Sequence, residues 1–429
     1  MQGRPLTAAR PSGNGGAKLF TLLVVLLPLT HQIASPFPFL SLGELVLVPF
    51  VFVLLVTGIR DGVYSPAALS VFYLVPIGAT FVDFFLYSGA YLLIADSFTV
   101  MARILFYYAL IVVSTKYFAK DFALKCYWGA IVVLMAVLVA QLFAHYALGF
   151  DVPIVQELGP ALFAPSQYAD TDTYYHMYGF RPASLFMEPS HCNLYVAPMV
   201  AILLLAPKKV LEGLSVRVAK RRIVLAVLLT VLQLLTTGSE SILLCGAVWV
   251  VFFLVPTSVT GIGLNYRIIF LSALVLSLLA GFAGGYLDFV LERTARGATL
   301  GPRVLRGLNI IQNMEPIQMV FGVGLNNVAN FVVQHSLYTS FDEANLEFTA
   351  SLLERYITSG AIGFAALVYF FVKQFGVQKM LVQKAILILI VVAFAYSAIE
   401  YTYWFAFFFV LGMSFGFEDE TQMEVKRHE

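Results

Sequence analysis

Charged residues and cysteines are scarce in this sequence. Only 12% of its 429 residues are charged, and 26 basic side chains balance 25 acidic ones to a net charge of +1, so no nucleic-acid partner is expected. The three cysteines, Cys126, Cys192 and Cys245, are odd in number and lie in or beside apolar segments, which argues against a disulfide framework or a zinc site. The six histidines show no metal-ligand spacing. We therefore expect neither a metal nor a cofactor.

Apolar residues, by contrast, are abundant. They make up 60% of the chain and raise its mean hydropathy to +0.86. A soluble protein cannot bury that much apolar surface, so the composition predicts an all-α, polytopic integral membrane protein. Residues 1–18 form a polar lead that we expect to be flexible and cytoplasmic. The apolar run after it lacks a convincing small-residue cleavage site, and we interpret it as the first membrane helix rather than a signal peptide.

Apolar runs long enough to cross a hydrocarbon core of about 30 Å predict about twelve transmembrane helices. They belong to one domain, residues 19–416, in which no internal repeat is evident. The expected spans are 19–35, 42–58, 66–86, 90–115, 124–148, 189–206, 222–237, 240–256, 267–285, 356–373, 384–400 and 401–416.

Basic residues predict the direction of these helices. With the N-terminus in the cytoplasm, every lysine-containing loop falls on the cytoplasmic side, as the positive-inside rule requires. Two long loops, about 149–188 and 286–355, then face outward, and the tail 417–429 returns to the cytoplasm. The cytoplasmic basic residues are Arg4, Arg10, Lys18, Arg60, Lys116, Lys120, Lys125, Lys208, Lys209, Arg217, Lys220, Arg221, Arg222, Arg267, Lys373, Lys379, Lys384, Lys426 and Arg427.

The second outward loop contains the stretch "RTARGATLGPRVLR", residues 293–306, with four arginines and no acid. The outward loops contain no lysine, although either residue would supply positive charge. The planar guanidinium group can donate hydrogen bonds to two phosphate oxygens in parallel, which an ammonium group cannot do. The stretch therefore predicts a bound anion, such as the diphosphate of a polyprenyl carrier lipid. Alternatively, these arginines contact lipid headgroups or pair with Asp288, Glu292 and Glu315.

Part of this stretch has the pattern of an amphipathic helix. Arg303 and Arg306 are three residues apart and share one helix face, while Leu305, Leu308 and Ile310 or Ile311 form the other. Such a helix is expected to lie on the membrane surface, with its arginines facing lipid phosphates in general or one bound diphosphate. We expect Arg293 and Arg296 to form a flexible rim.

Another outward-facing motif, "GFRPASLFMEPSHCNLYVAP" (179–198), resembles the pattern R-x-x-G/S-x-F-x-E/N-P-x-x-x-x-x-Y of bacterial O-antigen and exopolysaccharide polymerases (Wzy-type) and their O-antigen ligase relatives. Three further stretches, at 234–241, 301–327 and 343–363, are similar to family segments in the same order. The chain departs from the family pattern at Gly307, where an aromatic residue is usual, and at Ala344-Asn345, where His-Asn is frequent. The pattern positions are filled by Arg181, Ser184, Phe186, Glu188, Pro189 and Tyr195.

The resemblance implies a membrane glycosyltransferase C-type fold in the bacterial inner membrane, with both termini cytoplasmic and a metal-independent site open to the periplasm. The implied reaction polymerises polyprenyl-diphosphate-linked oligosaccharide repeat units into an O-antigen, capsule or exopolysaccharide. The donor and acceptor would both be lipid-linked, and a chain-length regulator and a flippase are further candidate partners besides membrane lipids. The alternatives are an O-antigen ligase, which transfers glycan to lipid A core in lipopolysaccharide synthesis, and a transporter for lipid-linked oligosaccharides.

The resemblance and the charge pattern together nominate the site residues. Arg181, Arg303 and Arg306 would hold the departing diphosphate, with Arg296 and Arg293 at the rim. Glu188 could also serve only the helix dipole, and His191 could be an interfacial histidine. The aromatic residues of the first loop suit sugar rings and equally suit a membrane interface. Candidates for orienting or deprotonating the acceptor are Glu188, His191 and Glu343 (with Asp342 beside it), and candidates for sugar binding are Tyr175, Tyr178 and Asn345.

Some charged residues fall inside the predicted spans, where such groups are costly and often functional. Asp83, Glu240 and Glu400 are expected near outer ends, where the interface solvates them, and Asp96 could pair with Arg103 across two turns of one helix. Glu44 is another such residue. The Gly-x-Gly in "FGVGLNN" (321–327) follows no strand-helix unit, so it predicts a close-packed turn and not a nucleotide loop.

Overall fold

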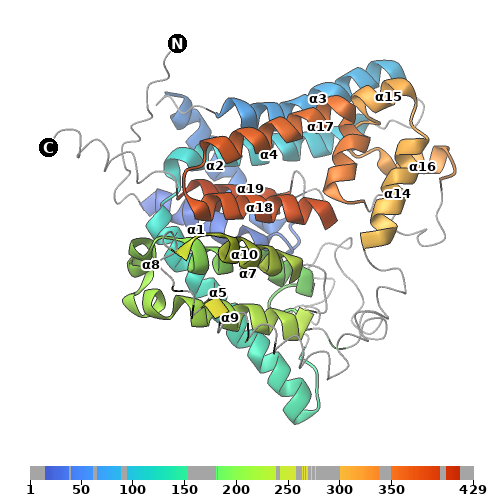
Figure 1. Cartoon of the computed structure of the whole chain (residues 1–429). Helices are drawn as coiled ribbons and strands as arrows, with labels where there is room; N and C mark the ends of the chain where they lie inside the picture. Colours follow the sequence, from blue (N-terminus) through green and yellow to red (C-terminus); the bar gives the residue numbers. More distant parts are fainter. Residues whose placement is uncertain are drawn as a thin grey trace.

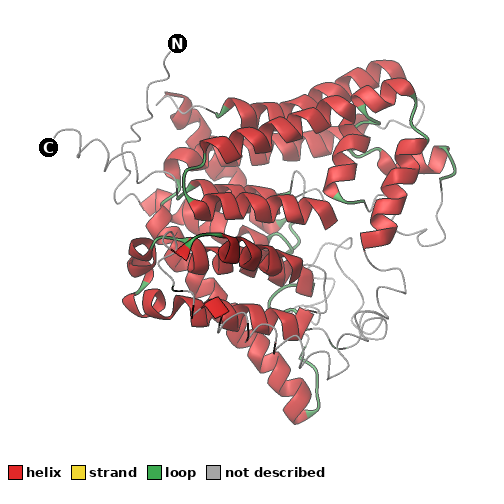
Figure 2. Ribbon diagram, viewed as in Figure 1, coloured by secondary structure: helices red, strands yellow, loops and turns green. Residues whose placement is uncertain are grey.

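The computed structural model shows an all-helical protein (Figure 2). One isolated antiparallel bridge joins Ala34 to Ser41 in the first turn between helices. The residues that the structure describes are 15–37, 40–60, 65–87, 94–152, 180, 182–237, 242–257, 263, 265, 267–268, 272, 276, 300–337, 349–396 and 402–415.

The first half of the chain supplies α1 (Gly15–Thr30), α2 (Leu42–Arg60), α3 (Ala67–Tyr87), α4 (Ile94–Tyr117), α5 (Lys120–Phe143), the π-helix η1 (Ala144–Leu148), α7 (Pro189–Leu205) and α8 (Lys208–Leu214). The second half supplies α9 (Val216–Thr237), α10 (Ile242–Leu254), α14 (Leu300–Gln312), α15 (Pro316–Phe321), α16 (Val328–Gln334), α17 (Ser351–Val377), α18 (Leu381–Tyr396) and α19 (Tyr403–Met413). Figure 1 shows these helices with their labels.

The helices coincide with the apolar runs of the sequence. Five described segments are long and apolar enough to cross a membrane: 42–59, 67–86, 97–117, 120–148 and 351–377. Five more apolar helices, α1, α7, α10, α18 and α19, are shorter than that length. The prediction of an all-α membrane protein is therefore confirmed, whereas the count of about twelve spans is not. Most of the ninth expected span, 267–285, lies outside the described residues.

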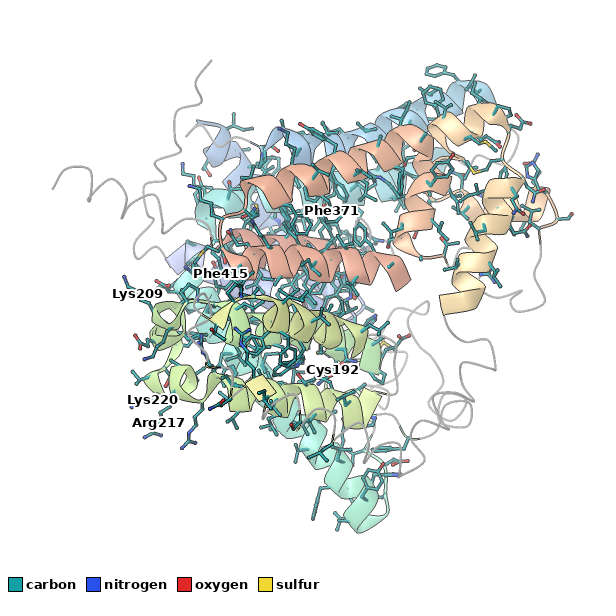
Figure 3. All side chains as sticks on the ribbon, viewed as in Figure 1. Cys192, Lys209, Arg217, Lys220, Phe371 and Phe415 are labelled. Atoms are coloured by element: carbon teal, nitrogen blue, oxygen red, sulfur yellow. The ribbon has the colours of Figure 1, made fainter. Side chains whose placement is uncertain are left out.

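Two helices form the centre of the bundle. Every residue of α7 from Cys192 to Leu205 is buried, and so is every residue of α19 from Tyr403 to Gly412. A helix that is apolar on all sides belongs in the interior, because no face of it is suited to water. Around α19 an aromatic core joins α3, α17 and α19, and Figure 3 labels its neighbour Phe371. The core members are Phe72, Phe370, Phe405 and Phe409.

The lysine-containing segment of α8 and α9 and the arginine-containing segment of α14 lie at opposite ends of the bundle. Figure 3 labels Lys209, Arg217 and Lys220 at the end formed by α8 and the start of α9, which we call the lysine end. Figure 1 places α14, α15 and α16 at the other end, which we call the arginine end. This separation is the one that the predicted sidedness requires.

Thiol labelling is expected to place the arginine end outside the cytoplasm. In a background with the three native cysteines replaced by serine, Gln312→Cys on α14 and Lys209→Cys on α8 both put a thiol at an exposed position. A membrane-impermeant maleimide should label Gln312→Cys on intact cells, and Lys209→Cys only after permeabilisation, since the reagent cannot cross the membrane that holds the protein. The reverse pattern would place α14 in the cytoplasm and remove the basis for a periplasmic site.

Candidate functional site

Residues 182–188 are a non-helical segment that enters the bundle just before α7. Most of its residues are buried, so many of its peptide groups need partners other than water. Ser184 has a left-handed backbone (φ 57°), its N–H donates to Gln141 Oε1 (2.9 Å), and its hydroxyl donates to Leu134 O (2.7 Å). Both contacts fasten the segment to α5.

A second glutamine fastens the same segment to the turn after α1. Gln32 Nε2 donates to Leu185 O (2.6 Å), and the Met187 N–H donates to Gln32 Oε1 (3.0 Å). One side-chain amide thus satisfies a donor and an acceptor of the buried backbone, as a neighbouring strand would. Gln32 and Gln141 together fix how the chain approaches Glu188.

Most described positions of the 181–195 motif hold the structure together. Phe186 is buried against Tyr195, whose hydroxyl donates to Val25 O (2.9 Å) and whose carbonyl accepts from the Tyr127 hydroxyl. Ser184, Phe186 and Tyr195 are therefore explained by packing. Among the motif positions that the structure describes, Glu188 is the exposed one.

Glu188 and His191 lie together at the start of α7. Glu188 is the N-cap residue with an extended backbone, and Pro189 follows at the first helical position. The Glu188 side chain makes no cap hydrogen bond, but its Oε2 accepts from the Ser190 hydroxyl (2.8 Å). The His191 ring lies 5.8 Å from the Trp404 ring, centroid to centroid, and the next residue, Cys192, is enclosed in the bundle (Figure 3). The structure thus brings together two of the three predicted acid–base candidates.

A buried polar cluster borders the turn between α1 and α2. Ser41 and Glu44 form a capping box, because the Ser41 N–H donates to Glu44 Oε2 (2.8 Å) and the Glu44 N–H donates to the Ser41 hydroxyl (3.2 Å). The Tyr107 hydroxyl donates to Glu44 Oε1 (2.6 Å), and Arg103 Nε lies 3.2 Å from the same oxygen. Glu44 is fully buried, whereas the Arg103 side chain is 36% exposed. The cost of burying this carboxylate is offset by an arginine and by two hydrogen bonds, from the Ser41 N–H and the Tyr107 hydroxyl.

Aromatic rings connect this cluster to the start of α7. His31 Nδ1 lies 3.0 Å from the Ser41 hydroxyl, and the His31 ring stacks on Tyr403 with centroids 3.8 Å apart. Tyr403 is followed by Trp404, the residue that approaches His191. His31 and Tyr403 were not predicted as site residues, and nothing in the local sequence distinguishes them from interfacial aromatics.

The structure gives Arg103 a partner that the sequence did not show, Glu44 on α2. The pairing of Arg103 with Asp96 on its own helix stays a prediction. The Asp96 side chain lies outside the described residues. The sequence could not show this because Glu44 and Arg103 meet only when α2 packs against α4.

Asp83 on α3 differs from its prediction. We expected an interfacial, solvated carboxylate, but the residue is fully buried. Neither of its carboxylate oxygens has a hydrogen-bond partner among the described residues. Glu240 and Glu400, the other two charges expected near outer ends, lie outside the described residues.

The helix α14 is amphipathic, and Leu305 and Leu308 lie on a different face from Arg306, as predicted. Leu305 is 67% exposed and Leu308 is also exposed, whereas Arg306 is only 5% exposed. The prediction of Ile310 or Ile311 on the leucine face is wrong for Ile310, which is buried like Arg306. The exposed leucines are suited to contact with lipid, and Arg306 is turned into the protein.

The structure explains why position 307 is a glycine and not the aromatic residue of the resembled pattern. A Cβ atom at this position would lie 2.7 Å from Leu353 Cδ1 on α17, so no larger side chain fits without displacing that leucine. The glycine thus allows α14 to approach α17 closely.

The turn at 322–324 is close-packed, as predicted. The N–H groups of Val323 and Gly324 donate to the carbonyls of Ile357 (2.8 Å) and Thr358 (3.1 Å) on α17. These carbonyls need outside donors because α17 kinks at Gly360, whose backbone (φ 60°, ψ −162°) interrupts the helical ladder. The turn therefore completes a broken helix.

Arg355, one turn before that kink, is a buried arginine that the sequence analysis missed. Its Nε donates to Gly363 O (3.0 Å) and its guanidinium reaches Phe72 O on α3 (2.5 Å), with Cζ lying 4.8 Å from the centroid of the Phe72 ring. Arg355 joins α17 to α3 and is accounted for by those contacts. Its position in "LLERYITS", just before an apolar run, was the available signal.

Several predicted site residues lie outside the described part of the chain. They are Arg181, Arg293, Arg296, Tyr175, Tyr178, Asp342, Glu343 and Asn345, together with the side chain of Arg303, whose backbone belongs to α14. The described candidates are thus Glu188 and His191 with the adjoining His31–Glu44–Arg103 cluster, and, on a separate element, Arg306 of α14. Among described residues no group of three or more histidine, cysteine, aspartate or glutamate side chains is placed to hold a metal ion.

Comparisons with known proteins do not identify this site. No protein-family model matches the sequence, and a search of curated proteins finds no match. Chemically, the described residues offer a carboxylate and an imidazole at one helix start and a buried guanidinium at the arginine end. That set suits proton transfer and the binding of an anion.

Proposed function

We propose that the protein is a membrane glycosyltransferase that polymerises polyprenyl-diphosphate-linked oligosaccharide repeat units at the periplasmic face of the bacterial inner membrane. The observation that carries the proposal is the orientation of α14. Arginines that bind the headgroups of surrounding lipids would face outward, but Arg306 faces the protein, while Leu305 and Leu308 are exposed. An inward guanidinium at the arginine end supports one bound diphosphate over contact with the bulk membrane.

In the proposed reaction a hydroxyl of the acceptor sugar attacks the anomeric carbon of the donor. The bond from that carbon to the diphosphate oxygen breaks, and its electron pair leaves with the polyprenyl diphosphate. Arg306, with Arg181 and Arg303 and with Arg293 and Arg296 at the rim, would stabilise the charge that develops on the leaving group. Glu188, His191 or Glu343 would orient or deprotonate the acceptor. Tyr175, Tyr178 and Asn345 would contact the sugars.

The polar clusters give this site a rigid base. Gln32 and Gln141 fix the segment that leads to Glu188, and the Glu44–Arg103 pair fixes the neighbouring turn. Catalysis by preorganised groups needs such support, because a donor that must first be oriented loses much of its effect on the transition state.

Purified protein in lipid vesicles is expected to extend a synthetic polyprenyl-diphosphate-linked oligosaccharide into a ladder of longer products, resolved by gel electrophoresis. An Arg306→Ala variant should give no ladder, whereas Arg217→Ala at the lysine end should give the wild-type pattern. Transfer to lipid A core with no ladder would replace the proposal by an O-antigen ligase. Movement of the lipid-linked sugar across the vesicle without any new glycosidic bond would indicate a transporter and refute glycosyl transfer.

A further inference from the structure

A histidine–aspartate pair lies at the end of α5 that is predicted to face the periplasm, and neither residue belongs to the site described above. His145 is in η1, a π-helical turn that extends α5, and Asp151 follows the turn. His145 Nδ1 lies 2.6 Å from Asp151 Oδ1. The His145 ring stacks on the Phe180 ring with centroids 3.7 Å apart and planes inclined by 6°, and the Tyr146 ring approaches it edge-on at 4.7 Å.

These contacts define which ring nitrogen carries the proton. An ionised carboxylate only accepts hydrogen bonds, so Nδ1 of a neutral His145 is the donor to Asp151. Nε2, on the opposite side of the ring, then has the lone pair and can take up a proton. The pair is accessible to a substrate, because the side chains of His145 and Asp151 are 32% and 39% exposed.

The arrangement is more ordered than a surface ion pair requires. A half-exposed pair contributes little stability, because water screens it and two side chains lose their freedom. Here the imidazole is held by a carboxylate at its edge and by an aromatic ring on its face. It also lies on a π-helical turn, a geometry that is found often at functional sites. A histidine held in this way resembles the oriented bases of hydrolases, in which a carboxylate holds the second ring nitrogen.

The chain links this pair to the proposed site. Phe180 directly precedes Arg181 in the sequence, and the segment 182–188 continues from it to Glu188. The pair is thus built against the start of the segment that leads to α7, at the same predicted face of the membrane.

We propose that His145 is the general base of the proposed glycosyl transfer and that Asp151 orients it; this inference rests on the proposed function. As the acceptor hydroxyl oxygen bonds to the anomeric carbon, its proton passes to His145 Nε2. The electron pair of the breaking carbon–oxygen bond leaves with the polyprenyl diphosphate. Asp151 stabilises the resulting imidazolium, which then releases its proton to water. His145 thus competes with Glu188, His191 and Glu343 for this role.

The test compares variants of the full-length protein in vesicles with the polyprenyl-diphosphate-linked oligosaccharide as substrate. His145→Ala is expected to lower kcat about 100- to 1000-fold with little change in KM, since general bases typically contribute factors of this size. Asp151→Asn should lower kcat less, because it removes the orienting charge but leaves the base. Tyr146→Phe, which keeps the ring beside His145, should retain the wild-type rate and serves as the control. Added imidazole should restore much of the His145→Ala rate, which a purely structural role would not allow.

Two results would overturn the inference. Wild-type-like kcat in His145→Ala would exclude His145 as the base, as would a loss that imidazole leaves unchanged. If these results come with an active wild-type enzyme, the proposed function stands and Glu188→Gln and His191→Ala identify the base instead. If the wild-type protein forms no glycosidic bond with any acceptor, both proposals fail.

Discussion

Replacing Arg306 by lysine is expected to reduce glycosyl transfer about 100- to 1000-fold, the usual loss when one preorganised donor to a developing negative charge is removed. Lysine keeps the positive charge but replaces the planar fork by a single ammonium group, which cannot bind two phosphate oxygens in parallel. Arg306 is only 5% exposed, and α14 cannot move closer to α17 because Gly307 already lies against Leu353, so a shift of the helix cannot bring the lysine into a two-pronged contact. The measurement is the initial rate of product formation in vesicles.

The matched control is Arg217→Lys. Arg217 is exposed at the lysine end, where only positive charge is needed, so this change should leave the rate unchanged. Both variants should elute and melt like the wild type, which separates lost catalysis from lost folding. A rate for Arg306→Lys within threefold of wild type would refute the proposal that Arg306 grips a diphosphate.

Replacing Gly360 by alanine is expected to destabilise the protein by about 3 kcal/mol or more, with loss of activity. The backbone at Gly360 (φ 60°, ψ −162°) lies in a region that is nearly exclusive to glycine, and forcing another residue there costs about 1–3 kcal/mol. In addition, a Cβ atom at position 360 would lie 2.2 Å from Val320 O near the end of α15, which is a steric clash because the distance is shorter than van der Waals contact. Relief of that clash must separate α15 from α17 and break the Val323 and Gly324 hydrogen bonds to α17.

Thermal unfolding and limited proteolysis measure the two parts of this effect. The melting temperature should fall, and the segment between α15 and α16 should become sensitive to protease. Gly376→Ala is the control on the same helix, because a Cβ atom there meets no neighbour within 4 Å. If the Gly360→Ala protein has the same melting temperature as the Gly376→Ala control, the close contact between α15 and α17 does not stabilise the fold.

Helical segments and the close-packed Gly-x-Gly turn could be predicted from the sequence. Long apolar runs can satisfy their backbone only as helices in a membrane, so α2, α3, α4, α5 and α17 appear where hydropathy is high. The turn was predictable because a Gly-x-Gly sequence that follows no strand-helix unit does not indicate a nucleotide-binding loop, which leaves a close-packed turn as the simpler interpretation. Both are properties of neighbouring residues.

The environment of each candidate site residue could not be predicted in this way. The sequence indicated that α14 is amphipathic, with Leu305 and Leu308 opposite the arginines, but it did not show that Arg306 is buried. Helical periodicity shows which residues share a face and does not show which face another helix covers. The motif around Glu188 likewise contained a serine and two aromatics that turned out to be packing residues.

By itself, then, the amino-acid sequence determined the helical membrane class, the positions of its apolar segments and the contrast between lysine-containing and arginine-only loops. These follow from local composition, because the transfer of a segment into lipid depends on that segment's own side chains. Only the tertiary structure decided that Gln32 holds Leu185, that Glu44 pairs with Arg103 and that His145 is oriented by Asp151 against Phe180. These contacts are between specific side chains brought together by folding, and each partner is chosen by how the helices and their connecting segments pack.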